Sequence, residues 1–158
     1  MSGLPITVAG AERLREELQR LKQVERPAVI DAIAQARGHG DLSENAEYDA
    51  ARERQAFVEG RIAELDHALS HARVIDPTEL DSGGLIVFGA TVEIEDLDTE
   101  EKVTYQIVGD IEADIRQNRI SVSSPVARAL IGRTEGDVVE VNTPAGPKEY
   151  EIVALRYE

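Results

Sequence analysis

The stretch ARGHGDLSENAEYDAAR (residues 36–52) interrupts a region that otherwise has the pattern of two long helices. It places Gly38 and Gly40 between two segments of helical apolar spacing and crowds acidic residues beside them. Neither segment can bury its apolar stripe alone, and the short connection makes them antiparallel neighbours. The stretch therefore predicts an αα-hairpin.

Both flanking segments carry the apolar spacing that a coiled coil needs. In the second segment, apolar or weakly polar residues recur at alternating steps of three and four, which is a heptad seam: Tyr48, Ala51, Gln55, Val58, Ile62, Leu65, Leu69 and Ala72. The first segment starts with Leu14, Leu18 and Leu21 and resumes with Val29, Ile33 and Ala36. Its register is lost near Glu25 and Pro27, so we expect a kink or local break near Pro27. About 30 residues per helix at about 1.5 Å each predict an arm of roughly 45 Å.

The pattern changes to short β-branched runs in the second half of the chain. Five runs separated by Gly, Asp, Asn or Pro predict strands of a small antiparallel sheet: GATVEIED, VTYQIVG, RISVS, DVVEVNT and KEYEIVALRY. One short helix is expected between them, with Ser124 as N-cap, Pro125 at its first position and Gly132 as its stop. The predicted class is α+β, with a helical hairpin followed by a sheet domain.

A break in composition divides the chain. RVIDPTELDSGG (73–84) interrupts every periodic pattern and reads as a linker. We therefore expect a coiled-coil arm over residues 1–76 and a globular domain over residues 77–158.

The composition excludes several classes of protein. With no cysteine among 158 residues, disulfide frameworks, thiol catalysis and cysteine-ligated zinc are excluded. The N-terminus has no basic region followed by an apolar core, and no window approaches the roughly 20 apolar residues of a membrane span, so we expect a cytoplasmic protein without a membrane partner. A net charge of −14 argues against a general polyanion binder. Any contact with nucleic acid must be local.

Asp41 and Glu44 are the most informative pair of acids in the opening stretch. Their spacing of three would place both carboxylates on one side of a helical start. In the simpler interpretation they form a capping box, with Asp in place of Ser or Thr. In the functional interpretation they face outward and hold a divalent cation, since oxygen ligands suit magnesium. Two ligands alone would make a weak site.

Several motifs together resemble one protein family. HGDLSENAEYDAAR (39–52), GRIAELDHAL (60–69), LIVFGATVEIEDLDTEE (85–101) and RISVSSPVARALIG (119–132) resemble, in order and spacing, the bacterial Gre transcript-cleavage factors of the GreA type. The resemblance covers nearly the whole chain. It implies an arm inserted through the secondary channel of bacterial RNA polymerase and a C-terminal domain of FKBP-like topology docked outside, acting as a monomer that rescues backtracked complexes.

The resemblance also implies roles for individual residues. Asp41 and Glu44 would hold a magnesium ion of the polymerase active site, shared only in the complex, while the protein has no cofactor of its own and the polymerase remains the catalyst. Arg37 and Arg52 would contact the 3′ end of the backtracked nascent RNA, although each could be an ordinary solvated arginine.

The remaining residues of these motifs would shape or dock the molecule. Asn45 and Tyr48 would shape the tip, Tyr48 mainly by packing in the seam. Ser124 and Pro125 would dock on the coiled-coil rim of the polymerase channel, with Val126, Leu130 and Ile131 packed either inward or across an interface.

The sequence is also compatible with other functions. A channel-binding regulator that does not promote cleavage would share the architecture, and a coiled-coil adaptor would share the arm. A prolyl isomerase is disfavoured, because its pocket needs an aromatic lining and this chain has two Phe and no Trp. His39 adjoins the acids, whereas His67 and His71 lack a third metal ligand and are expected at the surface.

Overall fold

A computed structural model describes residues 3–38 and 45–158. The chain forms two compact units. One is the arm, Ala11–His71, and the other contains the residues from Ala72 to Glu158 together with the N-terminal segment up to Gly10. The N-terminal segment, which the sequence grouped with the arm, thus belongs with the sheet.

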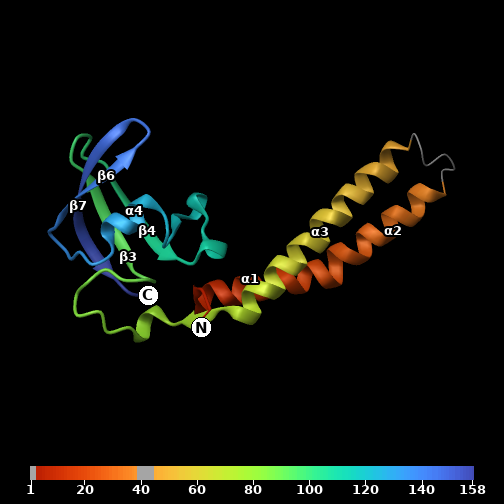
Figure 1. Cartoon of the computed structure of the whole chain (residues 1–158), viewed down its shortest axis with the longest axis horizontal. Helices are drawn as coiled ribbons and strands as arrows, with labels where there is room; N and C mark the ends of the chain where they lie inside the picture. The colour runs from red at the N-terminus through yellow and green to blue at the C-terminus, as the bar shows by residue number, and fades with distance from the viewer. Residues whose placement is uncertain (1–2, 39–44) are drawn as a thin grey trace. The chain divides into compact units, whose positions relative to one another are not determined.

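The arm is a helical hairpin, as predicted. It contains α1 (Val8–Arg20) from Ala11 onward, the π-helix η1 (Leu21–Glu25), α2 (Arg26–Arg37) and α3 (Ala46–His71). Figure 1 shows α2 and α3 running side by side, and residues of the two helices are in contact. Within the described part of the chain, the combination of length and hydrophobicity that a membrane crossing requires is found in no helix.

The predicted apolar seam forms the interior of the arm. The buried members from the first segment are Leu14, Leu21, Val29, Ile33 and Ala36, and those from the second are Ala51, Val58, Ile62 and Leu65. Burial of an aliphatic side chain contributes roughly 1.5–3 kcal/mol. The helices are therefore held by this stripe rather than by their intrinsic propensities.

The predicted break in the first segment is a π-helical turn directly before Pro27. The Arg26 amide donates to the carbonyl of Leu21, five residues earlier, instead of the usual four. Pro27 has no amide hydrogen to donate, so a regular helix cannot continue unchanged through this position. The π-helical turn therefore inserts one extra residue into the first segment at this point.

Ion pairs flank this seam. They are Arg26–Glu59, Arg54–Glu25, Arg61–Glu17 and Lys22–Asp66, with N–O distances of 2.7, 2.8, 2.7 and 3.4 Å. Most of these side chains are exposed, and such pairs contribute about 0–1 kcal/mol each. Their main effect is to fix the register between the helices.

The second unit is built on a mixed sheet. Its strands are β3 (Thr91–Asp96), β4 (Lys102–Val108), β5 (Arg119–Ser121), β6 (Val138–Thr143) and β7 (Gly146–Arg156), in the order β5-β4-β3-β7-β6. The α+β class is confirmed, and each of these five strands overlaps a run that the sequence predicted, with β4 and β7 starting one and two residues earlier than their runs. The expectation of a purely antiparallel sheet is wrong at one edge, where β4 and β5 pair in parallel. Two 3-10 turns between them, η3 (Asp110–Glu112) and η4 (Ile115–Gln117), carry the chain back before β5 starts.

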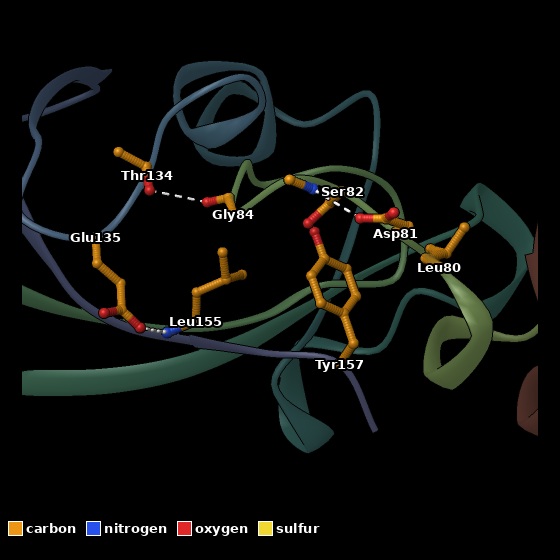
Figure 2. Close-up of a pocket in the computed structure, with 9 residues that line it drawn as sticks. Leu80, Asp81, Ser82, Gly84, Thr134, Glu135, Leu155 and Tyr157 are labelled. Carbon is orange, nitrogen blue, oxygen red and sulfur yellow. Dashed lines mark hydrogen bonds between the residues drawn. The ribbon is translucent and has the colours of Figure 1, made fainter.

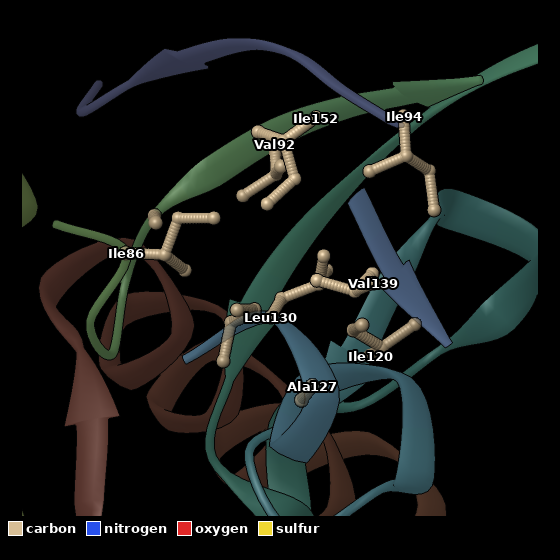
Figure 3. Packing of buried hydrophobic residues seen from close by; sticks show 10 residues of the cluster. Ile86, Val92, Ile94, Ile120, Ala127, Leu130, Val139 and Ile152 are labelled. Atoms are coloured by element: carbon tan, nitrogen blue, oxygen red, sulfur yellow. The ribbon is translucent and has the colours of Figure 1, made fainter. Parts of the chain in front are cut away.

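The core of this unit lies between the sheet and α4 (Pro125–Leu130). Figure 3 shows Val92, Ile94 and Ile152 of the sheet pointing toward the side of Ala127 and Leu130 of α4. Ile86, Val92, Ala127, Leu130 and Ile152 are completely buried. Buried positions alternate with exposed ones along β6 and with half-buried ones along most of β3, and this pattern favours one register of the strands.

The stretch predicted as a linker contains structure of its own. Its first residues form β2 (Arg73–Ile75), which pairs in parallel with β1 (Pro5–Thr7), and η2 (Pro77–Glu79) follows. Three-residue strands give little sequence signal, so this pair was not predicted.

A buried carboxylate fastens the N-terminal segment within this unit. Glu112 accepts hydrogen bonds from the Thr7 amide at 3.0 Å, from the Thr7 hydroxyl and from the Gly109 amide at 2.8 Å. The Thr7 hydroxyl in turn accepts the Gly10 amide at 2.9 Å, which caps the start of α1. We refer to Thr7, Gly10, Gly109 and Glu112 as the Glu112 clasp.

Candidate functional site at the end of the arm

The two acids that the sequence singled out, Asp41 and Glu44, lie outside the described residues, as does His39. The described chain ends at Gly38 on one side of them and resumes at Asn45 on the other. The other predicted tip residues are all described: Arg37, Asn45, Tyr48 and Arg52.

Asn45 joins the two helices of the arm. Its Oδ1 accepts the Tyr48 amide at 3.0 Å, which caps the start of α3, and its Nδ2 donates to the Ala36 carbonyl at 2.7 Å, near the end of α2. One amide side chain thus satisfies an unpaired donor of one helix and an acceptor of the other. Asn45 is thus the N-cap of α3, while the capping box predicted for Asp41 and Glu44 lies outside the described residues.

Tyr48 lies beside both predicted RNA-contacting arginines. The guanidinium carbon of Arg37 is 5.9 Å from the centre of its ring, and that of Arg52 is 6.0 Å away. Hydrogen bonding from Arg37, with the charges of Arg52 and Arg37, holds the pKa of the Tyr48 phenol below its usual value. Tyr48 is half buried. The four-residue spacing of Tyr48 and Arg52 on a helix was the sequence signal that this contact was possible.

Arg37 and Arg52 differ from the arginines further along the arm. Arg26, Arg54 and Arg61 each contact a carboxylate across the hairpin. Within residues 3–38 and 45–158, no carboxylate forms an ion pair with Arg37 or Arg52. No carboxylate of the described residues therefore balances the positive charge of these two exposed guanidinium groups, in a chain whose net charge is −14.

The predicted docking residues lie at the start of α4. The Ser124 hydroxyl accepts the Ala127 amide at 3.3 Å, so Ser124 is the N-cap that the sequence predicted, and Pro125 occupies the first turn with its ring exposed. Of the three apolar residues whose direction was left open, Leu130 is buried, Val126 is half buried and Ile131 is 37% exposed.

A cluster of hydroxyls stands beside that helix start. Asp110 accepts hydrogen bonds from the hydroxyls of Ser121 and Ser123, and they hold the pKa of its carboxyl below the usual value. The turn before α4 is thereby fixed.

A shallow pocket opens elsewhere on the second unit. Its volume is about 470 Å³, and it is lined by Leu80, Asp81, Ser82, Gly83, Gly84, Thr134, Glu135, Leu155 and Tyr157. Figure 2 shows that its polar groups bond to the chain itself: Thr134 donates to the Gly84 carbonyl at 2.8 Å, and Glu135 accepts the Leu155 amide at 2.9 Å. The Tyr157 hydroxyl donates to the Leu85 carbonyl. These bonds hold the loops around the pocket together.

The described residues do not by themselves form a metal site. Among them, no three His, Asp or Glu side chains converge as metal ligands. His67 and His71 are exposed, as predicted, with ring centres 4.3 Å apart and His71 Nδ1 bonded to the His67 carbonyl.

Comparison with known proteins covers both units. Residues 4–74 match the family model described as the N-terminal domain of transcription elongation factors, and residues 81–157 match the GreA/GreB C-terminal domain model. The chain is 64% identical over 157 residues to the transcription elongation factor GreA of Neisseria meningitidis serogroup A, covering 99% of each chain. It is 63% identical over 158 residues to that of Halorhodospira halophila, covering 100% of each.

Among solved structures, the GreA factor homolog 1 of Thermus thermophilus is 31% identical, with 98% of this chain and 99% of that chain covered and a TM-score of 0.44. The two family models and the identity along the full length agree with the resemblance in the sequence motifs. The chain belongs to the GreA/GreB family of transcription elongation factors.

Proposed function

We propose that this elongation factor binds RNA polymerase, inserts its arm through the secondary channel and stimulates the polymerase's own cleavage of backtracked nascent RNA. The polymerase supplies the catalytic magnesium and performs the cleavage, and the factor acts as a monomer. The observation that carries the proposal is the end of the arm. There, two guanidinium groups without a carboxylate partner among the described residues flank a sequence segment containing Asp41 and Glu44.

Each part of the arm has a task in this proposal. Asp41 and Glu44 raise the occupancy of the weaker of two magnesium ions, which together stabilise the entering and leaving oxygens during phosphodiester hydrolysis. Arg37 and Arg52 attract the phosphates of the displaced RNA end. Asn45 keeps the ends of α2 and α3 together. The start of α4, with Ser124 and Pro125, docks on the rim of the channel and raises the local concentration of the arm.

Cleavage of RNA in a stalled polymerase complex tests this function. The double variant Asp41→Asn/Glu44→Gln should lose stimulated cleavage while competing normally with the unaltered factor for polymerase. Raised magnesium should partly restore cleavage, because the carboxylates act through metal occupancy. The matched control is Asp49→Asn/Glu53→Gln, which also removes two negative charges, but from exposed positions of α3. Full activity in the tip variant would refute the metal-positioning role.

The same assay separates the rival function. A channel-binding regulator without cleavage activity would bind polymerase and slow elongation, and the unaltered factor would release no RNA fragment from the stalled complex.

A further inference from the structure

We propose that Tyr48 is a positioning residue that holds Arg37 and Arg52 as a pair for one RNA phosphate. The inference rests on the proposed function, since it assumes that an RNA end reaches the arm. It assigns to Tyr48 a role beyond the apolar seam.

The first step is the convergence of the three side chains. Arg37 is the last residue of α2, whereas Tyr48 and Arg52 lie one turn apart at the start of α3. The two guanidinium carbons are 5.9 and 6.0 Å from the same ring centre. Two long, flexible cations from different helices are thus brought to one aromatic side chain.

The second step is the charge of the group that holds them. A carboxylate, as in the Arg26–Glu59 pair with N–O distances of 2.8 and 2.7 Å, would hold a guanidinium but neutralise it. A phenol is uncharged below its pKa and still attracts cations through its oxygen and the face of its ring. Tyr48 therefore orders both arginines while leaving two positive charges for an anion.

The third step is the supply of donors. A guanidinium carries five N–H donors, whereas a phenol oxygen can accept few of them. Hydrogen bonding from Arg37, and to a smaller extent from Arg52, engages this oxygen and lowers the pKa of Tyr48. The donors that remain on two ordered guanidinium groups match the oxygens of a phosphodiester.

The fourth step is the backbone that supports the three residues. The amide of Tyr48 is fixed by Asn45, and the same side chain holds the carbonyl of Ala36, the residue before Arg37. The two helix ends that carry the arginines are joined at this point. Tyr48 then sets the directions of the side chains on that frame.

The variants Tyr48→Phe and Tyr48→Leu test the proposal. Tyr48→Phe keeps the ring and removes the oxygen, whereas Tyr48→Leu removes both. The maximal rate of RNA cleavage should fall about threefold in Tyr48→Phe and about tenfold or more in Tyr48→Leu, as expected for the loss of one or two ordered contacts. The factor concentration for half-maximal cleavage should stay unchanged, because docking does not involve Tyr48. Tyr105→Phe is the matched control in the other unit.

Two further readouts distinguish positioning from a general structural effect. The losses in the Tyr48→Leu and Arg37→Gln/Arg52→Gln variants should not multiply when combined, and both should shrink as salt rises and screens the phosphate contact. Arg54→Gln, which removes a charge two residues away from Arg52, should leave the maximal rate unchanged. Multiplicative losses or a salt-independent loss would overturn the proposal.

A measurement without polymerase separates failure of this inference from failure of the proposed function. Spectrophotometric titration of the free protein, compared with Tyr48→Phe, isolates the ionisation of Tyr48. Its pKa should be below that of an ordinary tyrosine and should rise in Arg37→Gln/Arg52→Gln. If this shift is absent, or if both Tyr48 variants cleave RNA normally, the positioning role is wrong. If the shift is present but the unaltered factor releases no RNA fragment from a stalled polymerase complex, the proposed function fails instead.

Discussion

The same substitution, Gly to Ala, should have opposite effects at two helical positions of this chain. Gly60 lies on an exposed face of α3, and a Cβ added there would meet no atom within 4 Å. Gly10 lies in the first turn of α1, where a Cβ would be 1.8 Å from Glu112 Oε1 and 2.4 Å from its Cδ. In a helix interior, Ala is favoured over Gly by about 1 kcal/mol.

At Gly60 this preference acts alone. Gly60→Ala should raise the free energy of unfolding by about 1 kcal/mol. For a chain of this length, that corresponds to a rise in melting temperature of about 2–4 °C.

At Gly10 the added methyl group must displace Glu112. The Glu112 carboxylate then loses the Thr7 amide, the Thr7 hydroxyl and the Gly109 amide, at about 1 kcal/mol for each buried donor left without its partner. The helix preference offsets about 1 of these 3 kcal/mol. Gly10→Ala should therefore lower the free energy of unfolding by about 2 kcal/mol and the melting temperature by about 4–8 °C.

Urea denaturation followed by circular dichroism and by tyrosine fluorescence measures both variants. A double-mutant cycle provides the internal control, since Gly10→Ala in a Glu112→Ala background should stabilise rather than destabilise. The coupling energy between the two positions should be about 3 kcal/mol, the sum of the lost bonds. If Gly10→Ala stabilises the unaltered protein as much as Gly60→Ala does, Glu112 moves aside freely and the reasoning on the clasp is refuted.

Three other substitutions probe the remaining contacts. Asn45→Ala removes the cap of α3 and the bond to Ala36, and should lower stability by about 1–2 kcal/mol in thermal melts, with faster amide exchange at residues 46–48. Ser124→Ala removes the N-cap of α4 and should lower the free energy of unfolding by about 1 kcal/mol. The variant should also compete less well with the unaltered factor for polymerase, and unchanged competition would argue against docking through this helix start. The pKa of Asp96 is lowered first by a hydrogen bond from the Asp98 amide and then by Lys148. The ionised carboxylate therefore contributes stability above the ordinary pKa of 3.8, and this contribution is lost as the pH falls below it. Asp96→Asn should reduce the fall in melting temperature between pH 5 and pH 2.

The elements whose signal is local were predictable from the sequence. The heptad from Ala51 to Leu65 gave α3 and its buried face, because helix periodicity acts over neighbouring turns. Ser124 and Pro125 gave the start of α4, because both act on their own helix. Pro27 correctly predicted the break in the first segment. The π-helical type of the turn was not predictable, because it depends on which carbonyl accepts the hydrogen bond from the Arg26 amide.

Features that depend on distant partners were not predictable in this way. The parallel edge pair β4–β5 depends on the path of residues 109–118, and β1 has no pattern of its own in three residues. Glu112 gave no sign of being buried, since its donors are supplied by Thr7, 105 positions earlier in the chain, and by Gly109. At the tip, the spacing of Tyr48 and Arg52 allowed a contact, but the approach of Arg37 from α2 needed the hairpin to be formed.

The Glu112 clasp has a consequence for how the chain folds during synthesis. The arm is built from contacts between neighbouring parts of the sequence, and such contacts form early. Thr7 leaves the ribosome long before Glu112, and at about 5–20 residues per second the 105 positions between them take about 5–20 s to synthesise. Until then, the Thr7 amide has no carboxylate to bind, and β1 has no β2 beside it before residue 75 is made. The first strand to be synthesised is thus among the last to be fixed, and a pause in translation between the arm and residue 112 would lengthen the time during which the N-terminal segment stays open to chaperones and proteases.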